Sequence, residues 1–430
     1  YNGSEKFSPE NRFAFFHSGA VGWTISEEPF MKYLREKNII DMLKIRASIG
    51  QIGSDASGDR FLYMTEWAAA AGNAKMNTLN GDNSIYGFYR ESKIGNPDIQ
   101  WEVVVKKNIG IDFAFLNGLL AGSVDIFRDD RSNIFVAGDS RTVPAYFGGT
   151  PPSVNKGEIK TTGYELELRV NKVFQNGLRL WGNFNMTHAR NTVIVRDDPV
   201  LLPSYRRDAG YAVNQYRSHI DKGFIQNYDM LIGTPSHDAN DGSMLIGDHY
   251  IVDFNGDGIV NANDQAPYQY SSSPENTYNA TIGLDYKGFG FFAQFYGVTN
   301  VTRDVSLTTF SGSMHLLTVY DNGQWWNPQT GTGDVVVPRW NSQTSYNDGT
   351  QFLYDGSYIR LKNVEVSYTW SKGWIKTIGL SRLKVYLNGN NLFLWTRMPD
   401  DREGNLGGYS GGGGAYPTVR RFNLCIKLDF

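Results

Sequence analysis

The chain ends in Arg421-Phe422-Asn423-Leu424-Cys425-Ile426-Lys427-Leu428-Asp429-Phe430, where an apolar side chain occupies every second position. Successive side chains of a β-strand point to opposite faces, so one face of this segment is apolar and the other is mostly polar. The pattern predicts a strand that separates an apolar environment from water. A strand of a soluble β-sandwich and a strand of a membrane β-barrel both satisfy it.

The same alternation recurs along the chain, which indicates many strands of one kind. It is clearest in residues 109–115, 164–170, 178–186 and 383–387. In total we expect about eleven strands, roughly half of the 22 in plugged outer-membrane transporters. The first is expected over residues 13–25. It is followed by a short helix that begins near Ser26, with Glu27, Glu28 and Pro29 in its first turn, and stops near Asn38.

The connections between these strands alternate between short and long. Tight turns are expected at residues 116–119, 174–177, 287–288 and 371–379, and long loops at 51–100, 137–162, 191–276, 300–356 and 396–417. The loops are rich in Gly, Asn, Ser, Asp and Pro, which favour turns. Short turns at one end and long loops at the other are typical of outer-membrane barrels. We therefore predict an all-β fold, a transmembrane antiparallel β-barrel with long extracellular loops.

Composition excludes several classes of protein. The 430 residues include 44 Asp and Glu against 41 Lys and Arg, with no basic block, which argues against a nucleic-acid partner. No apolar run reaches about 18 residues, which excludes a helical membrane protein. The single cysteine, Cys425, excludes an intrachain disulfide framework. Because the chain starts at Tyr1 without a signal peptide, we expect it to be a processed chain or a piece of a longer one.

Residues 253–264 (DFNGDGIVNAND) match the template of a calcium-binding loop, except that an aspartate replaces the final glutamate. Calcium prefers oxygen ligands, and this spacing directs several side-chain oxygens and one carbonyl toward one centre. The candidate ligands are Asp253, Asn255, Asp257, Ile259 through its carbonyl, Asn261 and Asp264. We expect calcium as a structural cofactor that stiffens a long loop; the alternative is an acidic, glycine-rich loop without an ion.

The sequence does not favour an enzyme. The six histidines lack the spacing of a metalloprotease motif, and neither a nucleophile elbow nor a phosphate-binding loop is present. Glu165 and Glu167 have the residue type of a glycosidase carboxylate pair. Their spacing of two residues on the polar face of a strand is better explained by a barrel wall that faces water than by a catalytic pair. We predict no catalytic residues.

Aromatic side chains crowd one of the long loops. Flat aromatic faces suit stacking against sugar rings or peptide side chains. The candidates for substrate binding are Tyr320, Trp325, Trp326, Trp340 and Tyr354, with Tyr346 nearby. The alternatives are that they pack the loop onto itself or form a belt at the membrane interface.

Several ordered motifs together resemble the SusC/RagA-type TonB-dependent outer-membrane transporters, over nearly the whole chain. In chain order they are YNGS at 1–4, GW at 22–23, LKIR at 43–46, GNPDIQWE at 95–102, TGYE at 162–165, the loop at 253–264, DGSYIRLKN at 355–363, NGNNLF at 388–393 and the terminal Phe430.

This resemblance implies a 22-stranded barrel that surrounds an N-terminal plug, energised through TonB and covered by a SusD-like surface lipoprotein. Residues 1–430 would be the C-terminal portion of the barrel, in contact with outer-membrane lipid, while the plug and the first strands lie outside this sequence. The partners implied are that N-terminal portion, the TonB complex and the lipoprotein. Phe430 matches the terminal aromatic residue that serves as the barrel-assembly signal.

The function that we predict is active import of oligomeric nutrients across the outer membrane, glycan oligosaccharides first and oligopeptides next. A rival interpretation is a soluble, secreted, calcium-stabilised β-rich protein, either a glycan-binding module or a glycosidase. A third is a barrel that only anchors surface lipoproteins.

Overall fold

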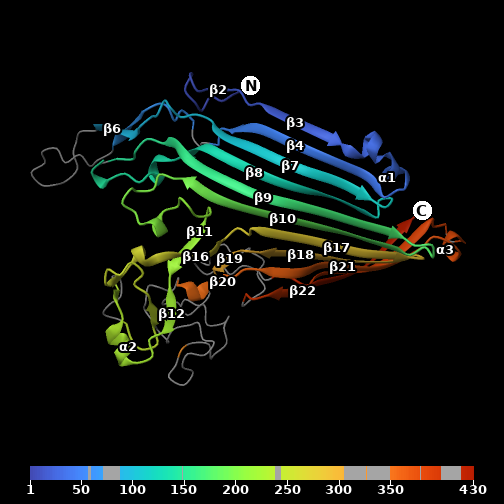
Figure 1. Ribbon diagram of the computed structural model, residues 1–430. Helices are drawn as coiled ribbons and strands as arrows, with labels where there is room; N and C mark the ends of the chain where they lie inside the picture. Colours follow the sequence, from blue (N-terminus) through green and yellow to red (C-terminus); the bar gives the residue numbers. More distant parts are fainter. Residues whose placement is uncertain are drawn as a thin grey trace, which may run out of the picture.

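The computed structural model describes residues 1–56, 60–70, 88–147, 149–237, 244–304, 326, 349–377, 379–398 and 418–430. Its main feature is one curved antiparallel sheet of eleven strands (Figure 1). The strands are β3 (Ser18–Thr24), β4 (Ile40–Ser54), β7 (Glu102–Phe115), β8 (Leu120–Val136), β9 (Val154–Val173), β10 (Arg179–Val195), β17 (Asn276–Tyr286), β18 (Phe289–Thr299), β21 (Tyr358–Trp370), β22 (Arg382–Thr396) and β23 (Arg421–Asp429). They lie side by side in chain order, with β3 and β23 at the edges. The predicted all-β antiparallel fold is confirmed.

The two faces of the sheet differ in polarity as the alternation predicts. Val21, Ile126 and Leu424 lie on one face and are 74%, 65% and 74% exposed. Directly paired residues of neighbouring strands share a face, so the pairs Ile45↔Ile111, Ile111↔Val124 and Val124↔Leu166 extend this apolar surface from strand to strand. A wide exposed apolar face suits contact with lipid.

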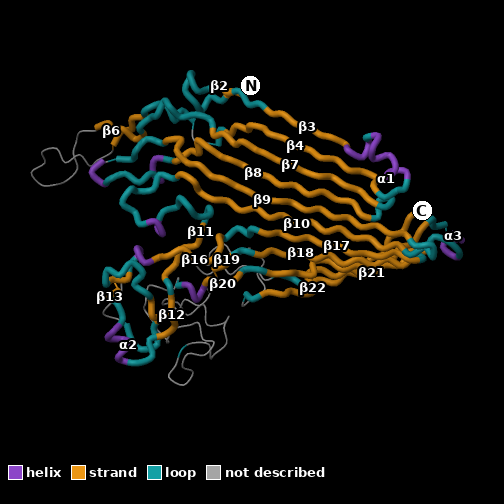
Figure 2. Tube along the Cα trace, in the orientation of Figure 1, coloured by secondary structure: helices purple, strands orange, loops and turns teal. Residues whose placement is uncertain are grey.

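Tight turns join the strands at one end of the sheet, and the long connections lie at the other end (Figure 2). At Lys287 and Gly288 both φ angles are positive, +47° and +89°, as a two-residue hairpin turn requires. Two turns carry helical segments: η1 (Ile25–Glu27), η2 (Pro29–Met31) and α1 (Lys32–Glu36) follow β3, and α3 (Trp374–Thr377) follows β21. The predicted helix is therefore present, but Ser26 lies inside η1 and its hydroxyl does not cap a helix.

The long connections fold into small elements of their own. These are β1 (Asn2–Gly3) with β2 (Phe13–Ala14), β5 (Glu66–Ala70) with β6 (Phe88–Lys93), β11 (Gln215–His219) with β16 (Gln265–Ser271), β12 (Asp221–Phe224) with β14 (His249–Ile251), β13 (Ser236–His237) with β15 (Ile259–Val260), and β19 (Thr302–Asp304) with β20 (Leu353–Asp355). Helical turns accompany them: η3 (Gly138–Ser140), η4 (Ala145–Phe147), η5 (Ser204–Arg206), α2 (Tyr228–Gly233), η7 (Ala262–Asp264) and η9 (Thr350–Phe352). The buried apolar clusters lie largely in these connections, for example Phe7 with Leu62, Ile99 and Trp101.

Several strand boundaries differ from the sequence prediction, and β4 also runs to Ser54, into the expected loop at 51–100. The first long strand begins at Ser18, not at residue 13, because Phe13 and Ala14 pair with β1. Strand β9 begins at Val154 and β10 extends to Val195, so both run into regions expected to be loops. Outside the apolar band neither face of a strand has to be apolar. Apolar and polar residues therefore alternate less regularly in these parts of the sequence. Among the described residues, no helix is long and apolar enough to cross a membrane.

Candidate substrate-facing site

The polar face of the sheet holds a charged cluster centred on Arg46 of β4. Its Nη2 donates to Asp125 Oδ2 at 2.6 Å, its Nε donates to Asp112 Oδ2 at 3.2 Å, and its Nη1 donates to Asn108 Oδ1 at 3.3 Å. Gly110 makes room for the guanidinium, because a Cβ there would lie 2.7 Å from Arg46 Cζ. This cluster joins β4, β7 and β8 through one cation that two carboxylates share.

Farther along the same face, five side-chain amides form one hydrogen-bonded chain across β17, β18, β21, β22 and β23. Asn423 donates to Asn390 at 3.4 Å, and Asn390 donates to Asn363; Asn363 donates to Gln294 at 2.6 Å, and Gln294 donates to Asn279 at 3.4 Å. We call Asn279, Gln294, Asn363, Asn390 and Asn423 the amide row. It offers uncharged donors and acceptors, which suit hydroxyl or peptide groups.

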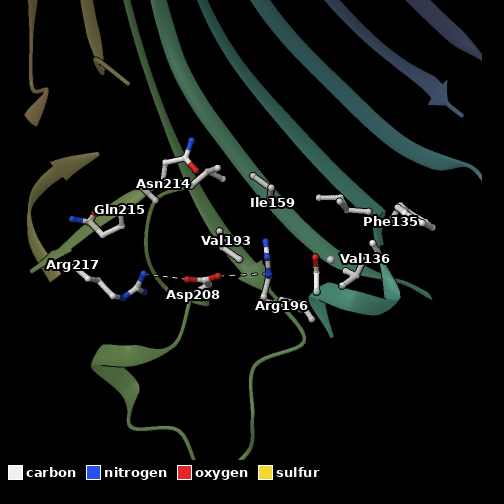
Figure 3. Close-up of a pocket in the computed structure, with 16 residues that line it drawn as sticks. Phe135, Val136, Ile159, Val193, Arg196, Asp208, Asn214, Gln215 and Arg217 are labelled. Atoms are coloured by element: carbon white, nitrogen blue, oxygen red, sulfur yellow. Dashed lines mark hydrogen bonds and ion pairs between the residues drawn. The ribbon is translucent and has the colours of Figure 1, made fainter. Parts of the chain in front are cut away.

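A pocket of about 410 Å³ lies at the long-loop end of β8, β9 and β10 (Figure 3). Val136, Ile159 and Val193 line one side. On the other side Asp208 lies between two cations: its carboxylate is 3.6 Å from Arg196 Nε and 3.1 Å from Arg217 Nη1. An apolar wall beside hydrogen-bonding groups is typical of a binding pocket.

The loop predicted to bind calcium is closed by its own hydrogen bonds. Asp253 accepts from the backbone N–H groups of Gly258 and Gly256, each at 2.7 Å, and these bonds, Gly258 first, hold the pKa of Asp253 below its usual value. Asn255 Oδ1 accepts from Asp257 N, and Asp257 Oδ1 from Ile259 N, both at 2.9 Å. The loop is therefore ordered around its polar side chains.

Asp264, the last candidate ligand, is fully buried. Its carboxylate accepts from the backbone of Phe254 (2.8 Å), Asn255 (3.2 Å) and Asn261 (2.8 Å), and Asn261 caps η7 in return. No group of three or more His, Cys, Asp or Glu in the described part of the chain is arranged to hold a metal ion. The role of the loop in calcium binding stays a prediction.

Two of the five aromatic candidates fall within the described residues. Trp326 is 8% exposed and its ring packs over Gly247, where a Cβ would lie 2.2 Å from Trp326 Cε3. Tyr354 packs against the cluster of Val298, Val301, Tyr358 and Met398. Tyr320, Trp325, Trp340 and also Tyr346 lie outside the described residues.

Phe430, the predicted barrel-assembly signal, follows β23 at the tight-turn end and is 90% exposed.

Sequence reasoning missed a buried contact within the long connection between β10 and β17. His249 Nδ1 lies 2.8 Å from Asp221 Oδ2, and both side chains are at most 4% exposed. The His249 ring lies between Phe224 and Phe352, whose centroids are 4.9 and 5.8 Å away. Nothing in the spacing of these residues signals the contact, because it depends on how the connections fold.

Comparison with known proteins gives one family match. The family described as TonB dependent receptor-like, beta-barrel, matches residues 1–392. Among curated relatives, TonB-dependent receptor P3 of Formosa agariphila is 25% identical, and TonB-dependent receptor SusC of Bacteroides thetaiotaomicron is 24% identical. Both alignments include 100% of this chain but only 43% and 41% of the relative, so the chain spans about two fifths of their length.

Solved structures show the same fold. The RagAB peptide transporter superimposes with a TM-score of 0.73 at 19% identity, over 100% of this chain and 44% of that one. The RagAB peptide importer in its closed-closed state gives a TM-score of 0.71, also at 19% identity, over 100% of this chain and 45% of that one. At this identity the likeness establishes the arrangement of the strands.

Proposed function

Because the chain belongs to the TonB-dependent receptor β-barrel family and lies in the outer membrane, we propose that it forms the C-terminal part of a barrel that imports oligomeric nutrients. The observation that carries the proposal is the contrast between the faces of the sheet: one is apolar and suits lipid, and the other carries the amide row. A TonB complex would supply the energy, and a SusD-like lipoprotein would cover the long-loop end. The relatives bear the names of receptors, which fits a protein that is not an enzyme.

We infer that the substrate is a glycan oligosaccharide, with oligopeptides as the close alternative. Uncharged amides bind sugar hydroxyls without the desolvation cost of an ionised group. They also bind peptide groups, and the related RagAB structures are named for peptide transport. The exposed apolar face disfavours the soluble, secreted glycan-binding module or glycosidase.

An uptake assay tests this function. Cells that lack the gene of the full transporter are expected to stop accumulating labelled oligosaccharides, and the intact gene restores uptake. Asn363→Leu together with Asn390→Leu removes the middle of the amide row and should reduce uptake about tenfold, because substrate groups would lose their partners. The matched control is Val364→Leu, on the apolar face of the same strand.

Three outcomes separate the alternatives. Loss of labelled peptide uptake, with oligosaccharide uptake intact, assigns the peptide class instead. Unchanged uptake of both classes in the deletion strain, with surface lipoproteins released, identifies a barrel that serves only as an anchor. Unchanged uptake in the double variant removes the amide row from the substrate path.

We further propose that the loop at 253–264 binds calcium. The Tyr205 ring lies 4.9 Å from the Phe254 ring, and the Tyr205 hydroxyl donates to the Asn263 carbonyl at 2.7 Å. Tyr205 is therefore close enough to the loop to transfer excitation energy to terbium bound there in place of calcium, and terbium luminescence should report binding. Calcium should displace terbium, and Asp257→Ala should weaken terbium binding at least about tenfold, because it removes one anionic ligand. Asp229→Ala on α2 is the control. Equal affinities in these two variants would place the ion elsewhere.

A further inference from the structure

Basic side chains form a row on the outer face of β7 to β10, just beyond the apolar band. Lys107 is directly opposite Arg128, Arg128 is opposite Thr162, and Thr162 is opposite Arg190. Directly paired residues share a face, so all four point the same way. Two residues closer to the tight turns, the same face carries Ile109 opposite Ile126, which are 61% and 65% exposed.

A groove of about 790 Å³ borders this row. Gly19, Lys107 and Arg128 line it at the level of the row, and Val21, Ala47, Ile109 and Ile126 line it two residues closer to the tight turns. The small side chains of Gly19 and Ala47 create its depth, and a Cβ added at Gly19 would meet nothing within 4 Å. The groove is therefore a shallow apolar trough with a cationic end.

This patch contains more cationic side chains than carboxylates that could neutralise them. Lys107 Nζ and Arg128 Nε share one carboxylate, that of Asp130, at 3.0 and 2.8 Å. Arg190 Nε lies 3.6 Å from Glu275 Oε1, and Lys160 is directly opposite Asp130 in the register. The Lys107 and Arg128 side chains remain 47% and 49% exposed. The patch thus carries net positive charge that remains accessible at its surface.

We propose that this groove binds an anionic lipid of the outer leaflet, with its phosphate between Lys107 and Arg128 and an acyl chain along the trough. Three observations support this occupant. The positive charge complements a phosphate, and arginine offers it a fork of donors. The trough continues directly from the cations, as an acyl chain continues from its headgroup. Long loops mark the extracellular side, so the patch lies at the level of the outer-leaflet headgroups.

This site is local to one sector of the sheet. Near the same end of the apolar face, β21 and β22 carry Ile359 opposite Trp395, an apolar and aromatic pair. Aromatic residues at this level are typical of a general membrane-interface belt. The row on β7 to β10 differs from that belt because its side chains are cationic and because it borders a groove. These two differences favour binding of a lipid with an anionic headgroup.

Native mass spectrometry of the full-length transporter tests the site, with equal amounts of monophosphoryl lipid A and phosphatidylethanolamine in the detergent. The wild-type protein should retain the anionic monophosphoryl lipid A in preference to the zwitterionic phosphatidylethanolamine. Lys107→Gln with Arg128→Gln should reduce that preference about tenfold or more, because two attractive charges are lost. The matched control is Lys106→Gln: its side chain is on the opposite face and pairs with Asp129 at 3.2 Å.

A second variant tests the trough separately from the charge. Gly19→Leu fills open space and keeps every cation, so it should reduce retention of the acylated lipid while the protein stays folded. Inorganic phosphate at the same concentration should not displace the lipid. The proposal is overturned if the charge variant and Lys106→Gln retain the lipid equally, if Gly19→Leu has no effect, or if inorganic phosphate competes.

Discussion

Replacing Arg46 by alanine is expected to lower the free energy of unfolding of the barrel by about 2 to 3 kcal/mol. Its guanidinium bridges two carboxylates, and the Asp125 side chain is only 9% exposed. Without Arg46, Asp112 and Asp125 would lie two register positions apart on neighbouring strands, with the half-buried Asp112 and the buried Asp125 both without their shared cation. Breaking a fully buried pair costs about 3 to 5 kcal/mol, but the Arg46 side chain is 35% exposed, so water screens part of the effect.

Related variants separate charge from geometry. Arg46→Lys retains the charge but cannot present a fork of donors to both carboxylates, so an intermediate loss is expected. Gly110→Ala retains all the charges, yet its Cβ would lie 2.6 Å from Asp125 Oδ1 and should force the cluster apart. The control is Arg169→Ala, whose side chain is 67% exposed beside Glu167 and should change stability by less than about 0.5 kcal/mol.

Denaturant unfolding of the detergent-solubilised full-length protein measures these differences, with the change in electrophoretic mobility on heating as a second readout. Equal stability of Arg46→Ala and Arg169→Ala would show that the cluster does not hold β4, β7 and β8 together. A large loss for Gly110→Ala with none for Arg46→Ala would show that backbone packing is the dominant effect.

The sequence predicts the membrane-facing sheet well because the signal for it is local. In β23 each apolar residue meets lipid and each intervening residue meets the interior, so five alternating positions suffice to predict a strand. The tight turns are equally local, as Lys287 and Gly288 illustrate. Prediction fails near the ends of β9 and β10, where the strands leave the apolar band and neither face is required to be apolar.

The candidate site is harder to predict because it depends on register and on distant contacts. Asn279 and Gln294 are joined only once the β17–β18 turn sets which residues face each other, and Asn363 joins them from β21. The contact between Asp221 and His249 depends on how the long connection between β10 and β17 folds back on itself, which the alternation does not determine. Residues 253–264 are the exception, since their spacing alone places the polar side chains around one loop.

Within that loop the prediction with the largest effect concerns Asp264. Asp264→Ala should destabilise the loop by about 3 kcal/mol, because three backbone N–H groups lose their bonds to a fully buried carboxylate, at about 1 kcal/mol each. Asp264→Asn keeps the shape but directs an NH₂ group at a backbone N–H, so a smaller loss is expected. Both effects act on the loop and should leave the sheet intact.

Limited proteolysis in the presence of a chelator measures this effect without calcium. Cleavage within residues 253–264 of Asp264→Ala should be about a hundredfold faster than in the wild-type protein, since opening becomes more frequent by that factor. The control Asp229→Ala, which removes an exposed carboxylate on α2, should be cleaved at the wild-type rate.

Adding calcium separates two roles of Asp264. If calcium protects the wild-type loop further but does not protect Asp264→Ala, the buried carboxylate organises the ligands. If calcium protects both equally, Asp264 acts only as a backbone cap and the other candidate ligands bind the ion without it.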